Sequence, residues 1–418
     1  CATSGFSDAA MVSPRRELRT YTVEGMGAPL AGGAYAPFDA SALKKIPEEP
    51  EEPEPRQATT ESTEPLNPRS DAVKREDESC TSIFAVAVFS FVPVLIFASI
   101  ALTVFLLVWP NGKSGVWLYC QASVAWSHDR ECEDAPVPWL YVNLATVVYL
   151  LWGALVDPAS RTGYRYATCC RGGWFWRAFA QYFPVELQGE PLDPDSGPYI
   201  IGYHPHGIIS VGAFAAFGTN GCGWVDGPGS LGVQPHLLTL PVNFKIPFLR
   251  ELLLSLGLCE SDKNTFRSIL KKSGGKKAVV VVIGGAEEST HAQTGTYDLT
   301  LVNRKGFARE ALISKASLVP CFGFGETDVY NVDSTAGCCM KLQEIMKKTM
   351  GFTIPLFSGR CGPMPWPSKV VVVLGEPLAP PDVPPDFDPK SQEGQKMIDD
   401  FHARYCRGLR QLWQANKE

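Results

Sequence analysis

The fold and the chemistry of this chain both depend on the stretch YIIGYHPHG, residues 199–207. Its first part, Tyr199–Tyr203, is continuously apolar and predicts a buried β-strand. Pro205 ends that strand, because proline has no N–H to donate to a neighbouring strand and its own φ is fixed. Gly207 has no side chain, so backbone or substrate can come close to the turn. The stretch therefore predicts a buried strand that ends in a tight, uncrowded turn.

Two imidazoles lie at this turn. His204 and His206 are two of only six histidines among the 418 residues. Histidine has an unperturbed pKa close to neutrality and is the usual general base, so the pair favours a catalytic site. A structural pair and half of a metal site stay open, since residues i and i+2 of an extended segment project to the same face. The other histidines show no metal-ligand spacing and no CxxC pair is present, which counts against metal.

From about residue 157 the sequence alternates between strand-like and helical segments. The runs 278–283 and 370–373 are continuously apolar and β-branched, as in strands buried on both faces of a sheet. We predict strands at 198–203, 236–242, 277–283, 317–323 and 369–374, and helices at 246–257, 263–273, 304–315, 338–350 and 392–414. This order predicts an α/β fold over residues 158–418, a mostly parallel sheet flanked by helices. Ligands of such sheets bind beyond the carboxyl ends of the strands.

Residues 1–80 differ in composition from the rest. They carry 9 Lys/Arg and 15 Asp/Glu, so they account for the whole formal net charge of −6. The run PEEPEEPEP at 47–55 cannot bury enough apolar surface to offset the entropy of ordering. We expect a disordered, Pro/Glu-rich acidic tail that is solvated rather than a specific interaction module. No part of the chain is basic enough to indicate a nucleic-acid partner.

Two apolar segments follow the tail, within residues 81–157. Residues 82–109 contain no charge and exceed the ~20 residues needed to cross a bilayer. Residues 137–156 are less apolar and have aromatic residues at both ends, as interface anchors do. Two full spans and a re-entrant hairpin both fit this pattern. Lys and Arg are more numerous outside the two segments than between them, so the positive-inside rule places both termini in the cytosol.

Cysteine usage and missing motifs limit the class of protein further. The 13 cysteines are scattered, with adjacent pairs at 169–170 and 338–339, which fits a reducing compartment rather than a disulfide framework. Only Cys120 and Cys132, in the loop between the apolar segments, are placed where they could pair. No GxSxG elbow and no GxxxxGK[ST] loop occur, which argues against a serine hydrolase and a P-loop NTPase.

Two further predicted strands are followed by a motif that combines glycine with acidic residues. After strand 277–283 comes GGAEE at 284–288, where the glycines let the backbone approach a ligand and a carboxylate could orient an imidazole. A plain turn with solvated acids fits this motif equally well. After strand 317–323 comes FGE at 324–326. Before that strand, NRKGFAR at 303–309 places cations near a helix start, where they oppose the macrodipole but would hold phosphates together with the helix amides.

In this order these blocks resemble the type-2 diacylglycerol acyltransferase family, which also contains monoacylglycerol and wax-alcohol acyltransferases. The resemblance covers most of residues 180–418. It rests on YFP at 182–184, HPHG at 204–207, PFLRE at 247–251 with LGL at 256–258, GGAEE at 284–288, RKGF at 304–307, VP at 319–320 with FGE at 324–326, FTIPLF at 352–357 with GR at 359–360, and GEP at 375–377. A membrane hairpin ahead of the catalytic domain is also similar to the family.

The resemblance implies transfer of a fatty acyl group from acyl-CoA to the free hydroxyl of diacylglycerol, giving triacylglycerol. Acyl-CoA is then a co-substrate, and no cofactor or metal is expected, because a thioester is already activated. The enzyme has to deprotonate an alcohol and stabilise an oxyanion. His206 is our preferred general base, and His204 supports it or binds substrate. Glu288 is the expected partner of the imidazole, because positions 209 and 211 are Ile and Val, where the related glycerol-phosphate acyltransferases use Asp.

Other positions take roles through the same resemblance. The expected backbone donors to the oxyanion are Gly207, Gly284 and Gly285. The expected ligands of the CoA phosphates are Arg304, Lys305 and Arg309. The residues expected to shape the substrate site are Tyr182, Phe183, Pro184 and Glu326, and for 182–184 a packing role is equally compatible.

Alternative functions stay open at this point. The acceptor could be a monoacylglycerol, a long-chain alcohol or a sterol, because apolar pockets discriminate weakly between similar lipids. A membrane metallohydrolase would use His204 and His206 as ligands and would respond to a chelator. A lipid-droplet scaffold protein would need neither histidine. We expect an endoplasmic reticulum membrane protein in contact with membrane lipids and able to associate with lipid droplets, and the sequence leaves homo-oligomerisation open.

Overall fold

Strand β2 (Tyr199–His204) is formed by the first six residues of the decisive stretch, and all six are buried. It lies between β5 (Lys277–Val282) and β6 (Ser317–Phe324) and pairs with both in parallel. A strand with a neighbour on each side and helices on each face meets no water, which explains its continuous apolar sequence. The predicted buried strand is therefore the central strand of the sheet.

Seven strands make up this sheet, in the order β1-β9-β6-β2-β5-β3-β4. The remaining four are β1 (Glu186–Gln188), β3 (Gln234–Thr239), β4 (Cys259–Glu260) and β9 (Val371–Leu374). Strand β9 runs antiparallel to β6, β1 runs parallel to β9, and all other neighbouring pairs are parallel. The mostly parallel α/β sheet is confirmed, and each of the five predicted strands overlaps an observed one. The short strands β1 and β4 are additions to the prediction.

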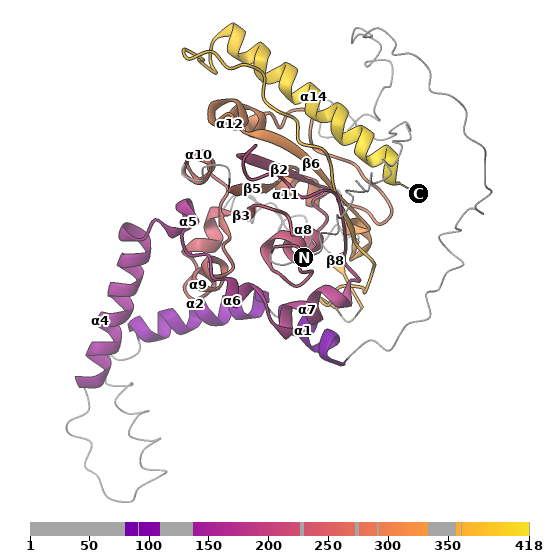
Figure 1. Cartoon of the computed structure of the whole chain (residues 1–418). Coiled ribbons are helices and arrows are strands. Elements are labelled where there is room, and N and C mark those ends of the chain that lie inside the picture. The colour runs from indigo at the N-terminus through magenta and orange to yellow at the C-terminus, as the bar shows by residue number, and fades with distance from the viewer. Residues whose placement is uncertain are drawn as a thin grey trace, which may run out of the picture.

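Helices cover both faces of the sheet (Figure 1). One face packs against α7 (Trp174–Tyr182), α8 (Val211–Ala213) and η4 (Phe214–Gly218), whose buried side chains share a core with Ile201 and Tyr203. The other face packs against α10 (Lys263–Lys271), α12 (Gly306–Ser314) and α14 (Gln392–Asn416), which cover Ile200. Successive residues of β2 thus point into opposite cores, as the pleat requires. Helices α10, α12 and α14 correspond to three of the predicted helices.

Shorter elements connect these layers. They are α5 (Ala159–Thr162), α6 (Thr168–Arg171), η5 (Pro241–Lys245), α9 (Leu249–Ser255), α11 (Gly285–Ser289), η6 (Glu326–Asp328) and the hairpin of β7 (Asn331–Val332) with β8 (Phe357–Ser358). Helix α9 corresponds to the predicted helix at 246–257. Helix α11 follows β5 directly, and η6 follows β6 directly, so both lie at the carboxyl edge of the sheet.

The apolar segments ahead of the sheet form helices with different surroundings. Helix α1 (Cys80–Ser90) packs on the domain, with the Phe89 ring 4.8 Å from that of Phe179. Helix α2 (Val92–Val108) follows it, and α4 (Val137–Leu151) continues into the π-helical turn η3 (Trp152–Val156). Figure 1 shows α4 extending away from the sheet. The predicted segment 82–109 is therefore divided between two helices, the first of which belongs partly to the core.

One helical stretch in the part of the chain that the structure describes, Tyr141–Thr162, is long and apolar enough to cross a membrane. Its most apolar window has a mean hydropathy of 1.4 and is only 6% buried, so it does not resemble the core helix of a soluble protein. The apolar helices Cys80–Ser90 and Phe97–Leu106 are shorter than a span requires. The second predicted membrane segment therefore has a matching helix, and the two-segment hairpin stays a prediction.

The computed structural model describes residues 80–90, 92–108, 137–225, 230–271, 276–290, 292–332, 357–360 and 362–417. Three expectations lie outside these ranges: the disordered tail ahead of Cys80, the Cys120–Cys132 pair and the helix at 338–350.

We expect Gly202→Ala in β2 to lower the free energy of unfolding by about 1–3 kcal/mol, because an added methyl group overpacks the core. A Cβ at Gly202 would overlap the Tyr405 hydroxyl and lie 2.6 Å from Ile283 Cδ1. The matched control is Gly306→Ala in α12, where a Cβ meets nothing within 4 Å. Thermal unfolding in detergent measures both variants. Equal thermal midpoints for the two would contradict the packing described for β2.

Candidate active site

Three neighbouring strands deliver candidate residues to one edge of the sheet. His206 follows β2, Glu288 lies in α11 directly after β5, and Glu326 follows β6. Because β5, β2 and β6 are adjacent and parallel, their carboxyl ends meet at the same edge. The expectation that these strand ends come together is therefore met by the topology.

Glu288 holds the backbone of His206. It is 2% exposed, and its Oε1 accepts the His206 backbone N–H at 2.5 Å while Oε2 accepts the Thr300 N–H at 2.8 Å. A Cβ at Gly284 would overlap this carboxylate, which explains the glycine at that position. Burial raises the pKa of Glu288 from its ordinary 4.5 to about 7, although both N–H donors favour the charged form. The expected contact with the imidazole is not formed: Glu288 fixes the main chain instead.

The imidazole of His206 is oriented by its own neighbour. Its Nδ1 lies 3.1 Å from the Gly207 carbonyl oxygen. Because a carbonyl only accepts, Nδ1 must carry the proton, which leaves Nε2 as the unprotonated nitrogen. Burial lowers the pKa of His206 below its ordinary 6.5, against the opposing effect of the Gly207 carbonyl. The His206 carbonyl in turn accepts the Ser210 N–H at 3.1 Å and its O–H at 2.9 Å. A neutral imidazole with a free Nε2 on a main chain held from both sides is suited to accept a proton.

Glu326 supports the same turn from the other neighbouring strand. It is 2% exposed, and its carboxylate accepts the N–H groups of Val211 at 2.6 Å and Gly212 at 2.8 Å and the Tyr203 hydroxyl at 2.6 Å. Gly207 has a φ of +55°, and a Cβ there would lie 2.9 Å from Glu326 Cγ. Burial raises the pKa of Glu326 to about 7, although its three donors favour ionisation. Glu326 lies beneath the turn, so it does not shape a substrate surface directly as predicted.

His204 is the last residue of β2, but its side chain does not join the contacts of the turn. It is fully buried on the face covered by α14, and its Nε2 is 3.1 Å from the Tyr405 hydroxyl. Burial lowers the pKa of His204 to about 3, and His402 adds to this effect. The predicted role of His204, assisting the base or binding substrate, stays a prediction. The described residues contain no group of three His, Cys, Asp or Glu side chains that could hold a metal ion.

The segment YFP is divided between core and surface. Tyr182 is buried and donates its hydroxyl to the Pro365 carbonyl oxygen at 2.8 Å, and Phe183 is fully buried. Pro184 is exposed. Of the two roles left open by the sequence, packing accounts for Tyr182 and Phe183.

The three predicted phosphate ligands are all ion-paired, each with a different carboxylate. Arg304 pairs with Glu287 at 2.7 Å, Lys305 with Asp399 of α14 at 2.7 Å, and Arg309 with Glu310 at 3.2 Å. Of the three cations, Arg304 is the one linked to the site, because its partner Glu287 is next in sequence to Glu288. Its side chain is 43% exposed, so an anion from solvent can reach it. Arg309 shares Glu310 with Arg267 and is less available.

Several contributors were missed by sequence reasoning, among them Tyr203, Tyr405, Ser210 and the Thr300 amide. Tyr203 and Tyr405 looked like core residues, since an apolar run does not show where a hydroxyl points. The Thr300 amide carries no side-chain signal.

Comparison with known proteins gives one consistent result. The family model described as diacylglycerol acyltransferase matches residues 137–418. The chain is 40% identical over 280 residues to diacylglycerol O-acyltransferase 2 of Dictyostelium discoideum, which covers 65% of this chain and 82% of the relative. It is 38% identical over 291 residues to diacylglycerol O-acyltransferase 2B of Umbelopsis ramanniana, covering 68% and 80%. It is 35% identical over 283 residues to diacylglycerol O-acyltransferase 2 of Mus musculus, covering 66% and 71%.

We expect the two buried carboxyls to make the folded chain less stable as the pH rises from about 4.5 to about 7. Both Glu288 and Glu326 have a folded pKa near 7 against an ordinary 4.5, so the folded chain binds more protons in this window. The stabilisation is complete below pH 4.5 and is lost as the pH passes 7, by about 3 kcal/mol per carboxyl.

Thermal unfolding of the wild type and of the double variant Glu288→Gln, Glu326→Gln across pH 4.5–8 measures this effect. The wild type should lose stability relative to the double variant as the pH rises. Parallel curves would show that neither carboxyl has a raised pKa.

Proposed function

The chain belongs to the type-2 diacylglycerol acyltransferase family, and on this premise we propose that it transfers a fatty acyl group from acyl-CoA to the free hydroxyl of diacylglycerol, with His206 as the general base. The products are triacylglycerol and CoA. The observation that carries the assignment of the base is the Nδ1–H of His206 on the Gly207 carbonyl at 3.1 Å, which leaves Nε2 free to accept a proton. Neither Glu288 nor Glu326 is free for this task, because both carboxylates accept backbone N–H groups.

The reaction follows from this geometry. Nε2 of His206 takes the proton from the acceptor hydroxyl as its oxygen attacks the thioester carbonyl, a step of general base catalysis typically worth about 10²–10⁴-fold. The tetrahedral oxyanion needs donors, and the Gly207 N–H is our candidate, since no acceptor for it is found among the residues described. Gly284 and Gly285 remain candidates for further backbone contacts. Collapse of the intermediate expels the CoA thiolate, which takes the proton from the imidazolium. No cofactor or metal enters this sequence of steps.

The acyl-CoA is proposed to bind at the start of α12. Arg304 and Lys305 are partly exposed there, and each pairs with a carboxylate that a phosphate can replace as partner. The acceptor reaches the site from a membrane, since the chain is membrane-associated through its apolar helices. We place the protein in the endoplasmic reticulum membrane with both termini in the cytosol, and lipid droplets are a second expected location.

We expect His206→Ala to lower triacylglycerol synthesis by about 10²–10⁴-fold, because the general base is lost. Microsomes that carry the protein receive labelled acyl-CoA with diacylglycerol, monoacylglycerol or a long-chain alcohol. The acid limb of kcat/KM for the wild type should lie below pH 6.5, since burial lowers the pKa of His206 and keeps it neutral at lower pH. The pH profile of the residual activity of His206→Ala should lack that acid limb.

A His206→Ala protein that retains most of its activity and the same acid limb would remove His206 from the mechanism. Label that enters only wax ester or diacylglycerol would reassign the acceptor. Label in no ester at all would reject the acyltransferase proposal.

We expect Arg304→Gln to raise the KM for acyl-CoA about ten-fold, because a charge-assisted contact with a CoA phosphate is lost. Lys396→Gln in α14 is the matched control, since Lys396 is exposed and lies outside the site. Initial rates at varied acyl-CoA and saturating diacylglycerol measure the effect. Unchanged KM in Arg304→Gln would place the phosphates elsewhere.

A further inference from the structure

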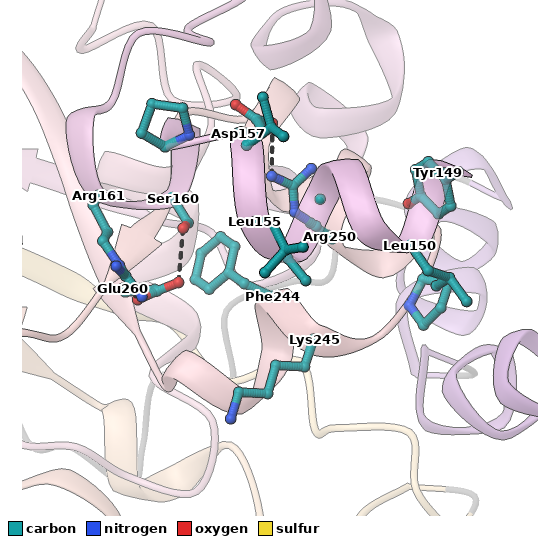
Figure 2. A pocket seen from close by; sticks show the side chains of 15 residues that line it. Tyr149, Leu150, Leu155, Asp157, Ser160, Arg161, Phe244, Lys245, Arg250 and Glu260 are labelled. Atoms are coloured by element: carbon teal, nitrogen blue, oxygen red, sulfur yellow. Dashed lines mark hydrogen bonds and ion pairs between the residues drawn. The ribbon is translucent and has the colours of Figure 1, made fainter. Parts of the chain in front are cut away.

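A cavity of about 520 Å³ lies apart from His206, where the end of the apolar helix meets the sheet. Its walls come from the last turn of α4, from η3 and α5, from η5 and the start of α9, and from Glu260 at the end of β4. Figure 2 shows its lining side chains, with the Asp157–Arg250 and Ser160–Glu260 contacts drawn as dashed lines. The volume is within the range of cavities that bind small organic ligands. None of these residues takes part in the proposed acyl transfer.

Four of the five charged side chains that line the cavity are paired within the protein, and the fifth, Lys245, is exposed. Asp157 and Arg250 form a buried ion pair at 2.6 Å. Glu260 accepts the Ser160 hydroxyl at 2.7 Å and the Arg161 Nε at 3.2 Å. What remains on the walls is mainly apolar: Leu150, Ala154, Leu155, Val156, Phe244 and Pro247. An apolar ligand therefore fits these walls, whereas an anion would have to break an existing pair or stay at the exposed Lys245.

The cavity opens beside apolar surface. Leu155 and Val156 of η3 are 78% and 67% exposed, and both belong to the stretch Tyr141–Thr162 that is apolar enough to cross a membrane. Exposed Val242 and Phe248 follow on the neighbouring segment of the sheet edge. The turn η3 is π-helical, a form that occurs often at functional sites. A lipid in a bilayer has direct access to this apolar surface. A water-soluble ligand would gain nothing from an entrance on that side.

The cavity and His206 lie at the same edge of the sheet. Both β3, which leads into η5, and β4, which ends at Glu260, run parallel to β2 through β5. Strand β4 is three places from β2, a separation of roughly 14 Å at the usual strand spacing. A long fatty acyl chain can extend over that distance. A lipid whose hydroxyl lies at Nε2 of His206 can thus reach the cavity with one chain.

We propose that this cavity holds one acyl chain of the diacylglycerol acceptor while the free hydroxyl of that lipid lies at His206. The proposal rests on the proposed function and names a binding site for its acceptor. We favour the acceptor over the donor as the occupant of the cavity, because diacylglycerol carries no charge and resides in the bilayer. Acyl-CoA carries phosphates that stay in water, on the side of Arg304 and Lys305.

The first test fills the cavity. Ala154→Trp adds a bulky side chain to an exposed lining position, and Ala145→Trp adds the same side chain to an exposed position of α4 that does not line the cavity. Each variant receives dioleoylglycerol or dioctanoylglycerol, with oleoyl-CoA or octanoyl-CoA. We expect the rate ratio of the long to the short acceptor to fall about ten-fold or more in Ala154→Trp relative to Ala145→Trp. The corresponding ratio for the two donors should be the same in both variants.

An acceptor ratio equal in the two variants would overturn the proposal. A change in the donor ratio would assign the cavity to the chain of acyl-CoA and would overturn it as well. If the wild type forms no triacylglycerol from any pair, the proposed function itself fails, which is a separate result.

The second test needs no variant and no turnover. A diacylglycerol with a diazirine at the end of one acyl chain is photolysed with wild-type protein in phosphatidylcholine vesicles. We expect crosslinked peptides that contain Trp152–Val156 or Pro241–Lys245, with labelling suppressed by excess dioleoylglycerol. Labelling confined to other segments would show that the chain binds elsewhere. This result stands even if Ala154→Trp proves too unstable to assay.

Discussion

Two buried carboxylates, one from each strand beside β2, hold the backbone of the turn that presents His206. Glu288 accepts the His206 N–H, and Glu326 accepts the N–H groups of Val211 and Gly212. Leaving a buried N–H without an acceptor costs about 1–3 kcal/mol, so these contacts are a substantial part of what keeps the turn in one conformation. Gly207 and Gly284 belong to the same arrangement. A side chain at Gly207 would clash with Glu326, and one at Gly284 would clash with Glu288. The position of the imidazole is thus decided by its neighbours at the ends of β5 and β6.

This arrangement separates positioning from proton transfer. In a Ser-His-Asp triad the carboxylate contacts the imidazole itself and stabilises its charged form. Here the carboxylates accept main-chain N–H groups, and within the described part of the chain the His206 imidazole bonds to the Gly207 carbonyl oxygen and to neither carboxylate. A neutral partner favours the imidazolium less than a carboxylate would, which agrees with the lowered pKa of His206. Such a base stays unprotonated near neutral pH, and a thioester, which is already activated, does not demand a stronger one.

The sequence was sufficient to predict the strands of the sheet, but not the contacts between individual atoms of the site. Apolar segments between helical ones predicted the five main strands, two of them as β-branched runs, whereas β1 and β4 are too short to carry a pattern. The meeting of the strand ends at His206, Glu288 and Glu326 followed from parallel topology. The topology did not show which group each carboxylate contacts, since the spacing of residues does not distinguish a backbone N–H from an imidazole. The burial of the His204 side chain on the α14 face did not follow from the motif, because i and i+2 share a face only while a strand continues, and β2 ends at His204. The uniform apolar run 82–109 gave no sign that Phe89 packs on Phe179, a contact made across the chain.

The contact between Tyr405 and β2 has a consequence for how the chain is made. The Tyr405 hydroxyl donates to the Gly202 carbonyl at 3.0 Å, across 203 residues of sequence. The central strand therefore leaves the ribosome long before the helix that covers one of its faces. Domains begin to fold during synthesis from their N-terminal side, at about 5–20 residues per second. Helices α10 and α12 precede α14 and can already cover Ile200, but until α14 is added the part of this face around Gly202 lacks its Tyr405 contact. The nascent chain thus passes through a state in which this face is only partly covered, and self-association there competes with the arrival of α14.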